Sequence, residues 1–115
     1  IEGAFIQGMG WLTTEELVWH PTTGKLMTHA PSTYKIPTAN DCPPVFNVKL
    51  FDGQNHEDSI HRSKAVGEPP LLLPFFAIRD AVSAVGGHRV DPPLRAPATS
   101  EAILNAIMAV QAGVQ

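Results

Sequence analysis

Eleven prolines restrict the parts of the 115-residue chain in which regular structure can form. Proline has no backbone N–H and fixes φ near about −65°, so it interrupts helices and is excluded from central strands. Residues 28–44 contain four prolines and residues 88–97 contain three, and both stretches are predicted to be extended connectors. Helices are therefore expected in the opening stretch, after Pro69 and after Pro97.

The opening stretch, residues 1–17, has the periodicity of a helix that buries one face. Its apolar residues recur at intervals of four, four and three: Ile1, Phe5, Met9 and Leu12. Three glycines, each costing about 1 kcal/mol relative to alanine inside a helix, lie in the same stretch: Gly3, Gly8 and Gly10. Either the helix packs closely against a neighbour, or its backbone amides approach a ligand. We prefer close packing, because no strand and turn precede the glycines as in a dinucleotide-binding motif.

Two regions predict strands. Residues 15–19 and 25–27 flank a turn at residues 20–24 that contains proline and glycine, a pattern typical of a hairpin. Residues 45–51 alternate in the period-two pattern of a half-buried strand, with three apolar side chains against two polar ones: Phe46, Val48 and Leu50 against Asn47 and Lys49.

Two longer helices are predicted in the second half of the chain. Residues 71–85 are apolar on nearly all sides, which suits a helix inside a larger structure, and Gly86 and Gly87 are expected to end it. The final helix is expected to begin near Thr99, whose hydroxyl can cap it, with Glu101 in its first turn. Its predicted buried face consists of Ala102, Ile103, Ala106, Ile107 and Val110. The expected fold class is α+β, with helices packed against a small antiparallel sheet.

Charge, hydropathy and cysteine content argue against nucleic-acid binding, membrane association and secretion. Eight Lys and Arg against eleven Asp and Glu give a net charge of −3, which offers no basic surface to nucleic acid or anionic lipid. No run of side chains approaches the roughly 20 apolar residues of a membrane span, and no signal peptide pattern is visible. The single cysteine, Cys42, cannot form an internal disulfide, so a reducing, cytoplasmic location is expected.

Few side chains have a pattern that points to chemistry. The five histidines are dispersed without the spacing of a zinc site, and Cys42 follows Asp41, whose charge disfavours a thiolate. Glu68 is different, because a glycine and two prolines hold its carboxylate on a stiff backbone directly before the apolar helix. Such a carboxylate suits a general base, but it also suits a helix-start glutamate stabilised by the helix dipole. The residues alone leave both interpretations open.

Three blocks of sequence carry a family resemblance. They are Glu-Gly-Ala-Phe-Ile-Gln-Gly at residues 2–8, Pro-Ser-Thr-Tyr-Lys-Ile-Pro at 31–37 and Ser-Lys-Ala-Val-Gly-Glu-Pro-Pro at 63–70. With these blocks the chain resembles the C-terminal part of the molybdopterin-binding subunit of xanthine dehydrogenases, within the molybdenum hydroxylase family. Because the sequence opens inside a patterned segment, residues 1–115 are expected to be a C-terminal fragment of the molybdenum-cofactor-binding domain.

The resemblance implies roles for individual residues. Glu68 corresponds to the catalytic base beside the molybdenum, and Gly67 would let the cofactor approach because it lacks a Cβ. Gln7, Gly8 and Lys64 lie in the matched blocks, where they have a structural role first and a cofactor-lining role second.

The resemblance also implies an activity and partners. The intact enzyme would hydroxylate purines oxidatively, hypoxanthine to xanthine and xanthine to urate, with molybdenum-molybdopterin as cofactor. FAD and 2Fe-2S clusters would lie in other parts of the complex. The expected partners are the purine, the rest of the molybdopterin subunit and the FAD/iron-sulfur subunit or domain, in an oligomer without nucleic acid or membrane.

One departure from the family pattern keeps alternatives open. Relatives carry about three further residues within the stretch that corresponds to residues 71–77. Three residues fewer would rotate the following part of a helix by roughly 60° relative to the preceding part. The alternatives are a non-catalytic, truncated or partner-dependent fragment, and a related hydroxylase of the aldehyde oxidase type.

Overall fold

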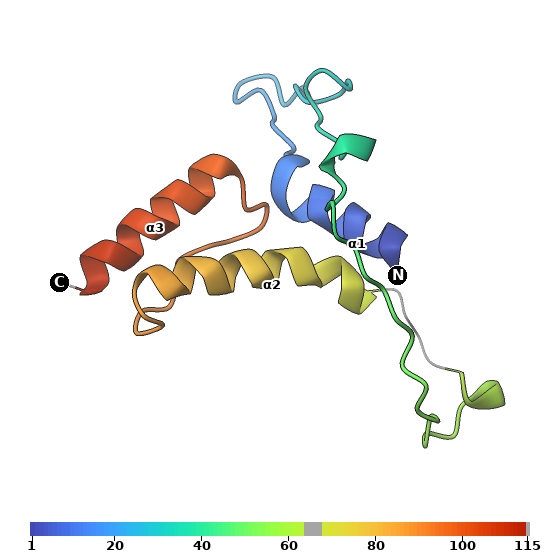
Figure 1. Cartoon of the computed structure of the whole chain (residues 1–115). Helices are drawn as coiled ribbons and strands as arrows, with labels where there is room; N and C mark the ends of the chain where they lie inside the picture. The colour runs from blue at the N-terminus through green and yellow to red at the C-terminus, as the bar shows by residue number, and fades with distance from the viewer. Residues whose placement is uncertain (64–67, 115) are drawn as a thin grey trace.

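Three helices dominate the part of the chain that the structure, a computed structural model, describes, which is residues 1–63 and 68–114. They are α1 (Glu2–Met9), α2 (Glu68–Val85) and α3 (Ser100–Val114). Three short helical turns accompany them: the π-helical η1 (Gly10–Thr14) and the 3-10 turns η2 (Ala39–Asp41) and η3 (Ile60–Arg62). Helix α2 lies in the centre, with α1 against its N-terminal half and α3 beside its C-terminal half (Figure 1).

The predicted antiparallel sheet is wrong. Within residues 1–63 and 68–114 the structure has a single antiparallel bridge, between Trp19 and Leu26, and no strand. The turn between them does form: the His20 N–H donates to the Lys25 carbonyl over 2.8 Å, and Gly24 adopts a φ of +67°. An isolated two-stranded hairpin without a further strand or an apolar face to cover it is marginal, so the bridge does not extend into a sheet.

Residues 45–51, the other predicted strand, form coil. A strand needs a neighbouring strand whose N–H and C=O groups pair with its own, and no described segment provides one. Phe46 alone of the alternating apolar residues finds an aromatic neighbour, the ring of Phe5 at a centroid distance of 5.1 Å. Phe51 is 87% exposed. The alternation therefore shows which side chains can be buried together, but it does not provide the second strand that a sheet requires. The fold of the described residues is helical.

Close packing explains why glycine occurs in α1. A Cβ built on Gly8 would overlap the carbonyl oxygen of Leu71 in α2 and would lie 2.6 Å from the Leu71 Cα. At Gly3 the same atom would meet nothing within 4 Å. The preferred interpretation of the glycines is thus confirmed at Gly8, where α1 lies directly on the backbone of α2.

The ends of α2 differ in how well the sequence predicts them. The helix begins at Glu68, whereas the prolines predict a start after Pro69. Proline is tolerated in a first helical turn because the N–H groups there have no acceptor within the helix. The helix continues through Pro74, which is buried. Gly86 and Gly87 end it as predicted, with Gly87 in the left-handed region at φ +61°.

The hydrophobic core lies between the C-terminal half of α2, the connector that follows it, and α3. Its buried apolar residues are Val82, Leu94, Ala98, Ala106 and Val110. The Thr99 hydroxyl accepts the Ala102 N–H over 3.2 Å and caps α3 as predicted. The predicted face of α3 is also confirmed, since two of its residues are buried and the other three pack against the core.

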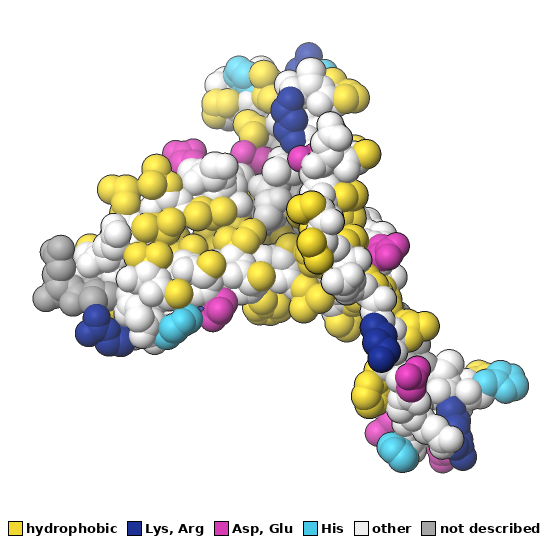
Figure 2. Space-filling view, in the orientation of Figure 1, with side chains coloured by type: hydrophobic (Ala, Val, Ile, Leu, Met, Phe, Trp, Pro, Cys, Tyr) yellow, Lys and Arg dark blue, Asp and Glu magenta, His cyan; other side chains and the backbone are white. Residues whose placement is uncertain are grey.

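The chain is far less compact than a typical globular protein of the same length. Its radius of gyration is 17.9 Å, against about 13 Å for a compact chain of this length. Its accessible surface is 8749 Å², whereas a compact monomer of 12.4 kDa exposes about 6,100 Å². Apolar side chains cover much of the visible face (Figure 2), and on α2 both Leu73 and Phe76 are more than half exposed. No described helix has the length and hydropathy of a membrane span.

We expect the isolated 115-residue chain to bind an apolar fluorescent dye such as ANS and to self-associate at micromolar concentration, because its apolar surface is uncovered. Fluorescence titration and light scattering measure both effects. Replacing the exposed Leu73 and Phe76 by asparagine should lower dye binding, whereas Glu101→Gln, an uninvolved surface change, should not. A monodisperse monomer that binds no dye would contradict the open structure.

Candidate functional site

Glu68, the predicted base, is the first residue of α2, and its side chain is exposed. Its position follows from the local sequence, since Pro69 and Pro70 fit the first turn of a helix and hold it in one conformation. Gly67, predicted to face the cofactor, lies outside the described residues, as does Lys64.

Gln7, the other predicted cofactor-lining residue, is exposed on α1 and directly precedes Gly8. Gly8 touches the Leu71 backbone, and Leu71 follows Glu68 by three residues in α2. Residues three apart lie on the same side of a helix, so the turn that carries Gln7 packs against the turn that carries Glu68. The structure therefore brings the motif blocks 2–8 and 63–70 together.

An open hollow of about 320 Å³ lies beside this contact. Its walls come from α1, from the coil after η2 and from the first turns of α2: Ile1, Phe5, Phe46, Asn47, Val48, Lys49, Pro70 and Leu73. The lining is mostly apolar, with Asn47 and Lys49 as its polar members. The hollow suits an apolar side chain better than a charged ligand.

The second motif block, residues 31–37, is held at the end of η1 by Glu15. Glu15 is 9% exposed and is the only buried charged residue among those described. A Cβ on Gly10 would overlap the Glu15 carboxylate and lie 2.5 Å from the Cδ of Pro37, so this glycine also allows close packing. The Tyr34 hydroxyl hydrogen-bonds to that carboxylate, and the Thr14 hydroxyl donates to the Lys35 carbonyl over 2.7 Å.

Glu15 and Tyr34 were not predicted as functional partners. The hydrogen bond to Glu15 raises the pKa of the Tyr34 hydroxyl above its usual 10.0, with desolvation and the carboxylate charge as smaller causes. The sequence features that lie nearest to this pair are Gly10 and the block 31–37. Glu15 and Tyr34 are 19 positions apart, and no sequence pattern indicates that their side chains meet.

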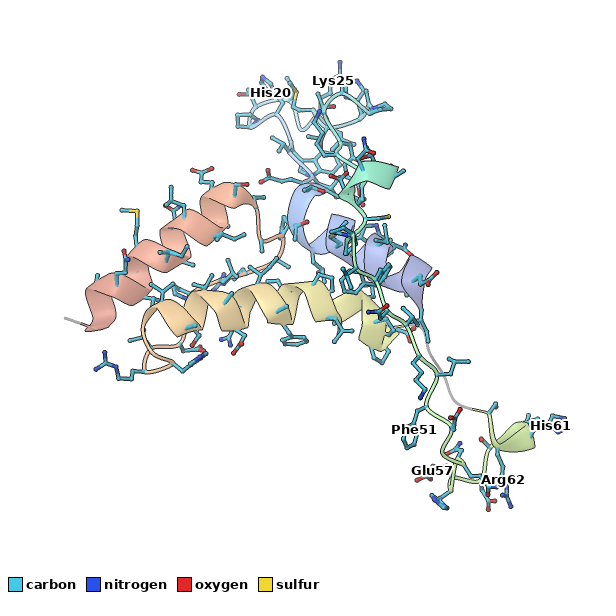
Figure 3. All side chains as sticks on the ribbon, viewed as in Figure 1. His20, Lys25, Phe51, Glu57, His61 and Arg62 are labelled. Atoms are coloured by element: carbon cyan, nitrogen blue, oxygen red, sulfur yellow. The ribbon has the colours of Figure 1, made fainter. Side chains whose placement is uncertain are left out.

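The histidines are not gathered into a site. His20 lies in the hairpin turn and His61 in η3, at the ends of two arms that extend in different directions from the helices (Figure 3). The Nδ1 of His20 accepts the backbone N–H groups of Thr22 and Thr23 over 3.3 and 3.2 Å, which is a structural role. In residues 1–63 and 68–114 no three His, Cys, Asp or Glu side chains lie close enough to hold a metal ion.

The opening part of the chain matches a known protein family. Residues 1–43, which include the first two motif blocks, match the family described as "Molybdopterin cofactor-binding domain". This match gives the class of the opening third of the chain, α1 and the arm that follows it.

The chain is similar over most of its length to several xanthine dehydrogenases. That of Emericella nidulans is 53% identical over 89 residues, covering 73% of this chain and 6% of the relative. Xanthine dehydrogenase 2 of Arabidopsis thaliana is 46% identical over 115 residues, covering 90% and 8%. The xanthine dehydrogenase/oxidase of Felis catus is 46% identical over 115 residues, covering 92% and 9%. By sequence the chain belongs with the molybdopterin-binding region of xanthine dehydrogenases, and it spans less than a tenth of these relatives.

The described residues do not by themselves form a cradle for a pterin cofactor. At Gly8 and Gly10 the space that a Cβ would take is occupied by other atoms of this chain, so it is not open to a ligand. No buried side-chain nitrogen or oxygen in this part of the chain lacks a hydrogen-bond partner that a ligand would supply. What the described residues offer such a group is an exposed carboxylate at Glu68 and an exposed amide at Gln7.

Tyr34 provides a direct test of the Glu15 contact, because it is the only tyrosine in the sequence. Its ionisation, followed by ultraviolet absorbance, should occur above pH 10.0 and move back toward that value in Glu15→Gln. A raised folded-state pKa stabilises the fold below the unfolded pKa, and the contribution is lost as pH rises through the folded value. Glu16→Gln, a change at the exposed neighbour, should leave the titration unaltered. An ordinary Tyr34 pKa in the unaltered chain would disprove the contact.

Proposed function

We propose that this chain contributes the catalytic base of a molybdenum hydroxylase, and that Glu68 is this base. The intact enzyme would hydroxylate purines oxidatively, hypoxanthine to xanthine and xanthine to urate. The observation that carries the proposal is the position of Glu68, whose exposed carboxylate begins α2 next to the α1 turn of Gln7. The bound molybdenum cofactor would supply the oxidising centre.

Glu68 is suited to accept a proton at a fixed place. A positioned general base contributes about 10²–10⁴-fold to a rate, provided that its oxygen lies within hydrogen-bond reach of the proton. The prolines after Glu68 limit the movement of its backbone, and the contact of α1 with α2 one turn later limits the movement of the helix. In the isolated chain the carboxylate faces solvent, so the proposal places the excluding walls in other parts of the enzyme.

The proposal makes residues 1–115 a C-terminal fragment of the molybdopterin-binding domain. Gln7 and Gly67 would line the cofactor, while most of its contacts, the FAD and the 2Fe-2S clusters would belong to other parts of an oligomeric, cytoplasmic enzyme. Two facts support this arrangement. The relatives are more than ten times longer than the chain. The chain also exposes about 2,600 Å² beyond a compact monomer, more than the roughly 800 Å² that one partner buries in a standard protein interface.

Glu68→Gln in the holoenzyme that contains this sequence should lower kcat for xanthine by at least about 10²-fold, because the amide cannot accept the proton. Molybdenum content should be unchanged. The matched control is Glu101→Gln, which alters an exposed glutamate in the first turn of α3. Retained turnover in Glu68→Gln would refute its role as base. Assay with an aromatic aldehyde in parallel would reveal an enzyme of the aldehyde oxidase type, if the aldehyde were the faster substrate.

A second candidate function is a non-catalytic or partner-dependent fragment. It is favoured by the absence of a cofactor cradle among the described residues and by the exposure of Glu68. We expect the purified chain, expressed in cells that make the cofactor, to contain far less than one molybdenum per chain. Metal analysis by mass spectrometry measures this directly. Stoichiometric molybdenum in the isolated 115 residues would show that they hold the cofactor unaided.

A further inference from the structure

Gly8 differs from the other glycines of its region in what it touches. A Cβ at Gly8 would meet three backbone atoms of Leu71: its carbonyl oxygen, its carbonyl carbon and its Cα. Helical backbone cannot move aside without moving its helix, whereas the tip of a flexible side chain can. Gly10, by comparison, faces the side chains of Glu15 and Pro37, and Gly3 faces open space.

The contact lies where it controls the position of Glu68. Leu71 is one turn after Glu68 on the same side of α2, and Gly8 is adjacent to Gln7 on α1. Any displacement of α1 from Leu71 therefore changes the distance between the first turn of α2 and the turn that carries Gln7. Ordinary contacts of a Cβ begin at 3.4 Å, whereas the Leu71 Cα would lie at 2.6 Å and the Leu71 carbonyl oxygen closer still. A side chain at position 8 therefore moves the helices apart by at least about 1 Å.

We infer that Gly8 is a positioning residue for the hydroxylation reaction: its missing side chain sets the place of the Glu68 carboxylate relative to the surface formed by α1. This inference rests on the proposed function, because it assigns a consequence to the place of Glu68. A shift of about 1 Å in a reacting group costs about 10²-fold in rate. Gly8 acts through α2 and touches no reacting atom.

The experiment compares three glycine variants of the holoenzyme. Gly8→Ala should lower kcat per molybdenum about 10²-fold, with little change in KM. Gly3→Ala should keep its kcat per molybdenum, because the new methyl group meets no atom of this chain within 4 Å and so does not press α1 away from α2. Gly10→Ala controls for crowding in general: it should lower thermal stability but keep kcat per molybdenum. Amide hydrogen exchange gives a readout independent of turnover, and exchange in the first turns of α2 should accelerate in Gly8→Ala alone.

A second variant keeps the inference testable if Gly8→Ala does not fold. Glu68→Asp withdraws the carboxylate by one methylene group, about 1.5 Å, and leaves the contact of α1 with α2 intact. It should reproduce the kcat loss with normal stability and normal hydrogen exchange. Full kcat in Glu68→Asp, or in a folded Gly8→Ala enzyme, would overturn the inference, as would a Gly8→Ala enzyme that loses its molybdenum. An active Glu68→Gln enzyme would instead overturn the proposed function itself.

Discussion

The approach of the Gly8 Cα to the backbone of Leu71 determines how the first and second halves of the chain meet. It places α1 across the start of α2, and with it the arm that Glu15 holds at the end of η1. At its other end α2 packs against α3 through Val82 and the buried face of α3. Because α2 takes part in both contacts, its position fixes the candidate site relative to the hydrophobic core.

The candidate site is a surface feature in this chain. Glu68 and Gln7 are both exposed, and the room that glycine leaves is filled by protein atoms. At the same time, apolar side chains such as Leu73 and Phe76 remain uncovered on α2. The exposed carboxylate and amide keep their solvation, whereas the uncovered apolar side chains are typical of a surface that another protein segment covers.

The sequence predicted the helical elements better than it predicted their partners. The cap at Thr99, the end of α2 at Gly87 and the buried face of α3 were confirmed, because each depends on atoms a few residues apart. The hairpin and the strand at residues 45–51 were wrong as sheet elements, because a ladder depends on a second segment. Glu68 was found from its neighbours in sequence, and its role as base stays a prediction. The pair of Glu15 and Tyr34 was missed, since only folding brings its members together.

The sequence by itself determined where α2 ends, where α3 begins and which residues resemble the molybdopterin-binding region of xanthine dehydrogenases. Backbone dihedrals, helix caps and motif chemistry are local, so a linear chain records them. Only the tertiary structure decided that Gly8 serves helix packing, that the alternating residues 45–51 remain coil, and that Glu68 begins a helix whose first turn lies against α1. Each of these depends on the distance between segments remote in sequence, which packing sets and composition does not.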